Sequence, residues 1–363
     1  MMTVQVDAFE SADCITSTYG TLVRHLGGEP AIFGSQWGFR PGRKADVEWP
    51  FERLNASRRS PCELMADWYD LQVVWTHHPD WDAATRQIRA TLDAGQPAVV
   101  VADAFCLPYC WQFGKQHSPH RIVLTAYGVD SVVISDGYRG SRYEGALALD
   151  DLCAAMTSDG LLFPRRMFID GRNTVITVPV PDAPLTEVTA EHTRRSLREN
   201  VTEYLSAGRA HGDGSGHDLL LRCAAEIRAD AAGLAQRTKT DVAEISAWFG
   251  GMASQRALNA AFLTWAADLL AAPSLKEHAD RSTALSRQWE KVRNYLYIRL
   301  SAQDRPGATV DGTAAVERVA GMVEETAVQE FSWCRGIDAE LHRPARSGSG
   351  QGNPQGLAGG GTG

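Results

Sequence analysis

A helix that begins at a cysteine is the first element predicted by the pattern of apolar positions. In FESADCITSTYGTLVRHLGG, apolar side chains recur with helical spacing at Ile15, Tyr19, Leu22, Val23 and Leu26. The pair Gly27-Gly28 ends this helix, and Cys14 stands in its first turn. Unpaired N–H groups and the helix dipole at that position favour a thiolate, so Cys14 is either a nucleophile or a buried structural cysteine.

The pattern predicts a region of mixed helices and strands that closes near Pro184. The expected helices after the first cover residues 82–95 and 148–158. The expected strands cover residues 97–105, 120–130, 131–140, 165–170 and 173–180. Gly128, Val129 and Asp130 separate the second strand from the third, so these two are predicted to pair as a hairpin.

From Leu185 onward the pattern is helical, and strand-like alternation disappears. The expected helices cover residues 189–208, 216–238, 254–272, 274–302 and 311–338. Stripes such as Phe262, Trp265 and Leu269 have the spacing of helix packing rather than of a cofactor site. We predict an α+β fold with a mixed domain at residues 1–184, an all-α domain at residues 185–343, and a disordered Gly-rich tail at residues 344–363.

Composition narrows the classes of function. The chain has 363 residues and a net charge of -8 without a long basic run, which argues against nucleic acid as a partner. No apolar run approaches a membrane span, and MMTVQVDAFE lacks the features of a signal peptide, so we expect a cytoplasmic protein that does not contact a membrane. Seven cysteines without regular spacing fit reduced thiols, and no metal site is predicted.

A histidine and an aspartate complete a candidate catalytic group with Cys14. His120 begins the strand RIVLTAYG and Asp136 ends the strand SVVIS, so a hairpin would bring both to the same end of a sheet. His120 would then take the thiol proton while Asp136 holds the imidazole. His117 is the competing base, but it lies in the loop QHSPH, without fixed strand geometry. A thiolate at a helix start that faces a sheet histidine is the arrangement of the papain-like fold.

These motifs resemble those of the butirosin biosynthesis protein H family. The resemblance rests on the Cys14 helix, FGSQWGF, DAFCLPY and HSPHRIVLTAYGVD with the later ISD, and it continues into the helical half through GMASQRALNAAFLTWAADLL and QWEKVRNYL. It implies a papain-like, cysteine-protease-like N-terminal domain and an acyltransferase activity in specialised metabolism, such as antibiotic biosynthesis. Cys14 would accept a polyketide, aminoacyl or peptidyl chain from a carrier-protein thioester, with His120 as general base and Asp136 orienting it.

The resemblance also implies further site residues. Asp103 and Tyr109 of DAFCLPY would line or brace the acyl pocket. Gln36 and Trp37 are predicted to contribute to substrate binding, with Gln36 or Gln5 joining the Cys14 N–H as oxyanion donors.

One residue departs from the family pattern. Family members often carry a histidine immediately before the cysteine, where this chain has Asp13. Its carboxylate either repels the thiolate or points to solvent.

The expected partners are an acyl carrier protein and a small-molecule acyl acceptor with an amine or hydroxyl nucleophile. No bound cofactor is expected, because phosphopantetheine arrives with the carrier. Carrier proteins are generally acidic, and Arg40, Arg43 and Lys44 in the loop after the Cys14 helix are the predicted docking residues. Self-association into a homodimer is left open.

Three other functions stay open at the level of sequence. The same acyl-Cys14 intermediate could be released by an internal nucleophile of its own chain, which would make the enzyme a cyclase. The same triad could act on water as a cysteine peptidase or amidase, although the attached helical domain argues against a protease. A non-catalytic binding protein would be expected to lack a triad member, and all three are present.

Overall fold

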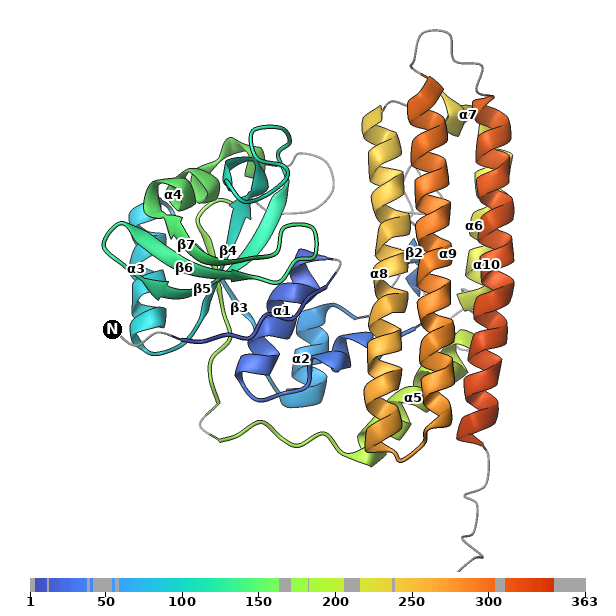
Figure 1. The fold of residues 1–363 in the computed structure, drawn as a ribbon, viewed down its shortest axis with the longest axis horizontal. Coiled ribbons are helices and arrows are strands. Elements are labelled where there is room, and N and C mark those ends of the chain that lie inside the picture. Colours follow the sequence, from blue (N-terminus) through green and yellow to red (C-terminus); the bar gives the residue numbers. More distant parts are fainter. Residues whose placement is uncertain are drawn as a thin grey trace, which may run out of the picture.

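The computed structural model describes residues 4–11, 13–37, 40–41, 54–55, 59–162, 171–181, 183–205, 216–236, 239–303 and 311–342. Within these residues a sheet-containing region comes first and a helical region follows from Ala190 (Figure 1). The predicted α+β class is confirmed. The papain-like arrangement of the first region stays a prediction.

A six-stranded antiparallel sheet is the centre of the first region. Its strand order is β3-β8-β4-β5-β6-β7. The strands are β3 (Val74–His77), β4 (Ala98–Asp103), β5 (Pro119–Tyr127), β6 (Ser131–Asp136), β7 (Tyr143–Ala148) and β8 (Thr174–Thr177). The predicted hairpin is confirmed as β5 and β6, with a register shift between Leu124 and Ala126. The strand predicted at residues 165–170 lies outside the described residues.

In the described residues of this region, helices and short 3-10 turns accompany the sheet. They are α1 (Cys14–His25), α2 (Pro61–Tyr69), α3 (Trp81–Asp93), α4 (Leu149–Thr157), η1 (Pro30–Gly34), η3 (Ala104–Cys106) and η4 (Asp159–Leu161). Sequence patterning missed α2, although Ser60 and Glu63 form a capping box around Pro61. A separate two-stranded pair joins β1 (Arg40–Pro41) to β2 (Leu54–Asn55).

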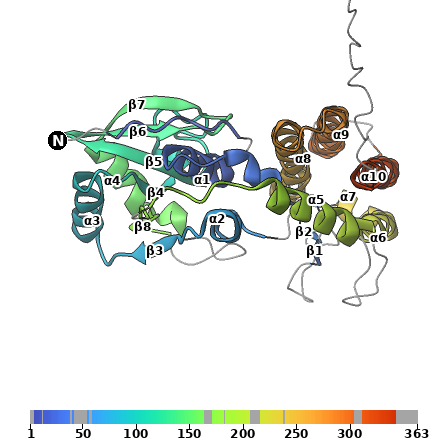
Figure 2. The same cartoon turned by 90° about the horizontal axis from the view of Figure 1, so that it is seen from below.

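The helical region is a bundle in which α8, α9 and α10 run side by side (Figures 1 and 2). Its helices are α5 (Ala190–Leu205), α6 (Gly216–Ala229), α7 (Ala231–Ala235), α8 (Lys239–Leu269), α9 (Ser274–Gln303) and α10 (Gly312–Leu341). The single helix predicted at residues 216–238 is two, because the chain leaves the helix at Asp230 and resumes at Ala231.

Buried apolar side chains form two clusters, and these do not follow the division between sheet and bundle. The smaller cluster lies between the sheet and α3 and α4, and includes Ile88, Val100 and Leu152. The larger one joins α1 and α2 to the helical region. At the junction, the Trp68 ring lies 6.0 Å from Phe262 and 6.3 Å from Trp265. The bundle therefore packs directly against α2, and the larger cluster extends from there to α1.

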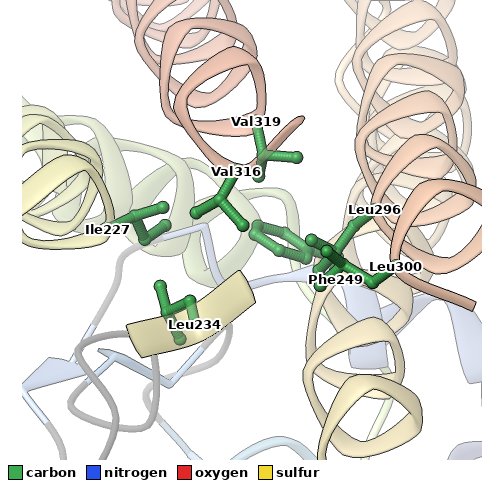
Figure 3. A pocket seen from close by; sticks show the side chains of 7 residues that line it. All are labelled: Ile227, Leu234, Phe249, Leu296, Leu300, Val316 and Val319. Atoms are coloured by element: carbon green, nitrogen blue, oxygen red, sulfur yellow. The ribbon is translucent and has the colours of Figure 1, made fainter. Parts of the chain in front are cut away.

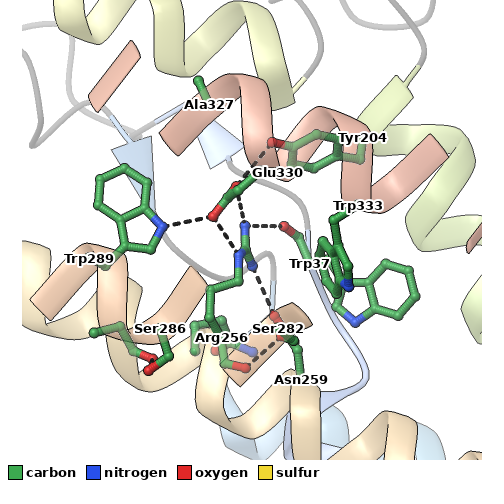
Figure 4. Close-up of polar contacts among 12 residues, drawn as sticks. Trp37, Tyr204, Arg256, Asn259, Ser282, Ser286, Trp289, Ala327, Glu330 and Trp333 are labelled. Atoms are coloured by element: carbon green, nitrogen blue, oxygen red, sulfur yellow. Dashed lines mark hydrogen bonds and ion pairs between the residues drawn. The ribbon is translucent and has the colours of Figure 1, made fainter. Parts of the chain in front are cut away.

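A fully buried ion pair stands at the centre of the bundle (Figure 4). Arg256 on α8 donates to both carboxylate oxygens of Glu330 on α10, at 2.7 and 2.8 Å. Glu330 also accepts from the Trp289 indole at 2.7 Å and from the Tyr204 hydroxyl at 3.0 Å. A buried charge pair is tolerated when its remaining donors and acceptors are satisfied. Arg256 also donates to the Trp37 carbonyl at 3.2 Å, so the network holds the segment after η1.

Side-chain amides clamp the same segment to the bundle. Asn259 donates to the carbonyls of Gly34 and Gln36, both at 2.8 Å. Asn200 accepts from the Trp37 N–H at 2.9 Å and donates to the Ser35 carbonyl. A Cβ at Gly34 would lie 1.9 Å from the Leu258 carbonyl oxygen, so only glycine allows this approach to α8. Because the segment follows α1 closely, these contacts fix α1 relative to the bundle.

Two cavities lie away from Cys14. One, of about 10 Å³, is lined by seven apolar side chains inside the bundle, among them Phe249, Leu296 and Val319 (Figure 3). It has room for no more than a single water molecule. The other, of about 350 Å³, lies beside His25 and Leu26 and the segment around Pro184. That is the opposite end of α1 from Cys14.

The described helices differ from membrane-spanning segments. Across the part of the chain that the structure describes, none combines the length and the apolar character that crossing a bilayer requires.

Candidate active site

Cys14 is the first residue of α1, as the sequence pattern predicts. Asp13 caps the helix, and its carboxylate accepts a hydrogen bond from the Thr16 N–H at 2.7 Å. The Asp13 carboxylate is thus held by the first turn of the helix and is not left to point freely to solvent. The Cys14 side chain is partly exposed and forms no disulfide. The N–H groups of Cys14 and Ile15 belong to the first turn, where a helix supplies no acceptor, so they are candidate oxyanion donors.

His120 and Asp136 meet at the end of the sheet. His120 Nε2 lies 2.6 Å from Asp136 Oδ2, and both side chains are buried. The register explains the contact: Val123 pairs with Ser135 and Leu124 with Ile134, so the same register places His120 diagonally from Asp136. Burial strengthens this charge-assisted hydrogen bond because little water competes for it.

Two further donors fix the Asp136 carboxylate. The Tyr109 hydroxyl donates to Oδ2 at 3.1 Å, and the Tyr138 N–H donates to Oδ1 at 2.9 Å. Tyr109 is itself stacked on Tyr143, with ring centroids 4.5 Å apart. With both oxygens occupied, Asp136 presents one fixed face to the imidazole. Tyr109 therefore braces the aspartate.

The second ring nitrogen of His120, Nδ1, does not face Asp136 and is free to interact with Cys14. Cys14 lies close enough to raise the pKa of His120, and since Nε2 faces Asp136, Nδ1 is the nitrogen available to the thiol. Burial by itself lowers the pKa of His120, but the hydrogen bonds and negative charges of Asp136 and Cys14 outweigh it and raise the pKa to about 10. The imidazole thus carries its proton at neutral pH, beside the sulfur.

A close approach between backbone segments brings α1 to the hairpin. A Cβ on Gly137 would lie 2.6 Å from the Phe9 carbonyl oxygen and 2.7 Å from Ser17 Oγ. Ser11 bridges to Tyr138 in parallel, and its N–H donates to the Gly137 carbonyl at 3.3 Å. Glycine directly after Asp136 is therefore required for the Cys14 helix to reach His120.

A second thiol, that of Cys110, lies beside His120 and Asp136. Donor atoms of Cys110, His120 and Asp136 all lie within 4.8 Å of one another. Burial raises the pKa of the Cys110 thiol to about 11. Sulfur, nitrogen and oxygen are the donors that zinc takes, but two ligands of one tetrahedral zinc would be about 3.3 Å apart. The 2.6 Å between His120 and Asp136 is a hydrogen-bond distance. The arrangement fits a hydrogen-bonded triad with a neutral thiol beside it.

His117 belongs to a different network. Its Nδ1 lies 2.6 Å from Oδ2 of the fully buried Asp103, which also accepts from Ser158 Oγ at 2.6 Å. The His117 ring stacks on Phe105, with centroids 4.2 Å apart. Burial opposes ionisation of Asp103, but its hydrogen bonds, led by those of Ser158 and His117, lower its pKa overall. The structure thus joins His120, and not His117, to Cys14, and Asp103 braces the loop that follows β4.

Gln36 and Trp37 make contacts that hold their own segment in place, and their role in substrate binding stays a prediction. The Gln36 amide accepts from the Arg59 N–H at 2.6 Å and donates to the Arg59 carbonyl at 2.7 Å. The Trp37 ring is fully buried, 5.1 Å from that of Trp333. The Gln36 side chain thus connects the segment after η1 to Arg59, and the Trp37 side chain packs this segment against Trp333.

Gln5, the second predicted oxyanion donor, lies at the far end of α1 from Cys14. Its carbonyl lies 3.0 Å from His25 Nδ1, at the last residue of α1. Eleven residues of helix separate His25 from Cys14, which corresponds to about 16 Å. Gln5 therefore lies at the wrong end of the helix to assist Cys14.

The predicted docking residues for a carrier protein are not tested by the structure. Arg43 and Lys44 lie outside the described residues, and of Arg40 only the backbone, in β1, is described.

Sequence reasoning missed Tyr138 and Cys110. Tyr138 had a local signal, since Asp-Gly-Tyr after a strand is typical of a turn in which aspartate accepts the N–H two residues on. The Tyr138 ring also lies 5.5 Å from that of His120. Cys110 had no such signal, because only the folding of the loop between β4 and β5 brings it to His120.

The proton on His120 gives a direct test by NMR. We expect the His120 imidazole to stay protonated at pH 7.5 and to titrate well above the ordinary value of 6.5. Asp136→Asn and Cys14→Ala should each lower its pKa, because each removes a group that raises it. Since the pKa of His120 is higher in the folded state than in the unfolded state, its protonation adds to the free energy of unfolding. This contribution is full below pH 6.5 and is lost as the pH rises toward 10.

Histidine-selective ¹⁵N labelling, with His120→Ala for assignment, would provide the titration. A His120 signal that titrates near 6.5 in the unmodified protein would show that the imidazolium is not held by the site.

Comparison with known families places the site inside a recognised domain. Residues 13–137 match the family described as butirosin biosynthesis protein H, N-terminal. The match begins one residue before Cys14 and ends one residue after Asp136, so all three residues of the group fall within it. No curated protein matches the chain. The description of the family refers to the biosynthesis of butirosin.

Proposed function

We propose that this protein is a cysteine-dependent acyltransferase of specialised metabolism. It takes an acyl chain from the phosphopantetheine thioester of a carrier protein onto Cys14 and delivers it to an amine or hydroxyl. The observation that carries the proposal is the buried hydrogen bond between His120 and Asp136, with Cys14 at the start of α1 near enough to raise the pKa of His120, inside the segment that matches the family.

The first half-reaction forms an acyl-enzyme. The Cys14 sulfur, as thiolate, attacks the thioester carbonyl, and the carbonyl oxygen gains negative charge at the helix N-terminus, where N–H groups and the helix dipole stabilise it. The carbon–sulfur bond to phosphopantetheine then breaks. The leaving thiolate takes the proton that His120 holds, so the products are acyl-Cys14, a free phosphopantetheine thiol and a neutral imidazole.

The second half-reaction releases the chain. Neutral His120 accepts a proton from the attacking amine or hydroxyl while the new bond to the acyl carbon forms. The bond to Cys14 breaks, and the sulfur leaves as a thiolate beside the regenerated imidazolium. Asp136 keeps Nε2 protonated throughout, so Nδ1 is the atom that releases and receives the proton.

Intact-protein mass spectrometry tests the acyl-enzyme directly. After mixing with an acyl-loaded carrier protein without an acceptor, we expect a single mass increase equal to the acyl group, and peptide mapping should locate it on Cys14. Addition of an amine acceptor should remove it. An unchanged mass with a range of acyl-loaded carriers and small thioesters, or acylation on a different cysteine, would refute the proposed function.

A further inference from the structure

The aromatic ring of Tyr138 lies against the imidazole of His120. The two ring centroids are 5.5 Å apart, and the ring planes are tilted by 56°, which is a contact geometry for aromatic rings. His120 and its partner Asp136 are buried, whereas Tyr138 is half-buried. A half-buried ring in contact with a buried one covers it on that side, so the phenol ring separates part of the His120–Asp136 pair from solvent.

The turn that carries this ring is fixed by its backbone. The Tyr138 N–H donates to Asp136 Oδ1 at 2.9 Å, and the Tyr138 carbonyl accepts from the Ser141 N–H at 2.9 Å, which closes a β-turn. Within the turn, the Arg139 N–H donates to the Ser11 carbonyl at 2.9 Å. The ring is therefore attached at a point that is bonded both to Asp136 and to the segment that leads into α1.

The far edge of the ring is held by its packing on Gly140. A Cβ at Gly140 would lie 2.8 Å from Tyr138 Cε1, 3.0 Å from Cζ and 3.1 Å from the hydroxyl oxygen. Any side chain at this position would thus displace the ring. The backbone bonds at one end and this close packing at the other define the position of the ring beside His120.

We propose that Tyr138 is a positioning residue whose ring keeps water from the His120–Asp136 pair, and that it thereby directs the acyl-enzyme to its amine or hydroxyl acceptor instead of to water. The inference rests on the proposed function and deepens it, because it concerns which nucleophile releases the acyl chain. Exclusion of water is a general means by which an active site protects a reactive intermediate from hydrolysis.

Hydrolysis would be the competing release reaction. The oxygen of a water molecule would bond to the acyl carbon while one of its protons passes to Nδ1 of neutral His120. The bond to Cys14 would then break, and the products would be the free carboxylic acid, the Cys14 thiolate and the His120 imidazolium. A ring that occupies one side of the imidazole leaves less room there for such a water molecule.

The first test measures how fast the His120 Nε2 proton exchanges with water, by NMR and without any acyl donor. Tyr138→Ala removes the ring but keeps the backbone N–H that Asp136 accepts, so exchange should become faster by a factor on the order of ten or more. Tyr138→Phe returns the ring and should restore slow exchange. Arg139→Ala is the matched control, since Arg139 is the next residue of the turn and is exposed, and it should leave exchange slow.

The second test measures the ratio of free acid to amide that is released from acyl-Cys14 at one fixed concentration of amine. Tyr138→Ala should raise this ratio roughly tenfold, and Tyr138→Phe should bring it back. Both products come from the same acyl-enzyme, so the ratio does not depend on how much of the protein is folded and active.

The two tests separate this inference from the proposed function. Faster exchange in Tyr138→Ala that Tyr138→Phe reverses supports the cover over His120 even if Cys14 is never acylated, in which case only the proposed function fails. Exchange that is unaffected by loss of the ring, or that Arg139→Ala accelerates equally, would overturn the inference. An unchanged ratio of acid to amide in Tyr138→Ala would overturn the role of the ring in selecting the nucleophile.

Discussion

Replacing Cys14 with alanine is expected to abolish the acyl-enzyme and all turnover. The sulfur is the atom that forms the bond to the acyl carbon, and the other thiol beside His120, Cys110, is buried and has a raised pKa. The fold should survive, because alanine is a good helix former and the Asp13 cap does not involve the side chain of residue 14. The measurement is intact mass after mixing with an acyl-loaded carrier, with circular dichroism to verify folding.

Cys110→Ser is the matched control for this substitution, because Cys110 is the other thiol beside His120. Its pKa is raised by burial, as are those of Cys106, Cys153, Cys223 and Cys334. Acylation should therefore persist in Cys110→Ser, and iodoacetamide should modify Cys14 faster than these five thiols. Loss of the acyl-enzyme in Cys110→Ser with Cys14→Ala still active would reverse the assignment of the nucleophile.

Replacing His120 with alanine is expected to slow acyl-enzyme formation by a factor on the order of 10² or more. The substitution removes the proton donor for the departing thiol and the acceptor for the incoming nucleophile. It also leaves Asp136 buried without its charged partner, so thermal unfolding must accompany the kinetics. Stopped-flow measurement of single-turnover acylation gives the rate.

His117→Ala provides the comparison, since His117 is also hydrogen-bonded to a buried aspartate. We expect a much smaller change in rate, because Asp103 and Ser158 tie it to a network separate from Cys14. A larger loss in His117→Ala than in His120→Ala would make His117 the base and remove Asp136 from the mechanism.

The sequence determined the local parts of the candidate site. The helical spacing after Cys14 and the cap at Asp13 are short-range features, and they place the cysteine at the first residue of α1. The hairpin of β5 and β6 has a short connection around Gly128, so its register is set over few residues and brings His120 to Asp136. Binary patterning likewise predicted the long helices after Ala190, because their apolar stripes are periodic.

Only the tertiary structure decided how these parts meet. The contact between the Cys14 helix and the hairpin depends on the space at Gly137, and spacing along the chain contains no information about that distance. Gln36 and Trp37 follow the cysteine helix closely but are held against the bundle, because Asn200, Arg256 and Asn259 form hydrogen bonds with their backbone. Cys110 reaches His120 and Asp136 from the loop between β4 and β5. Periodicity and turn chemistry act over a few residues, whereas the packing of α8 against η1 joins residues more than 200 positions apart, and that packing brings the helical region to the nucleophile.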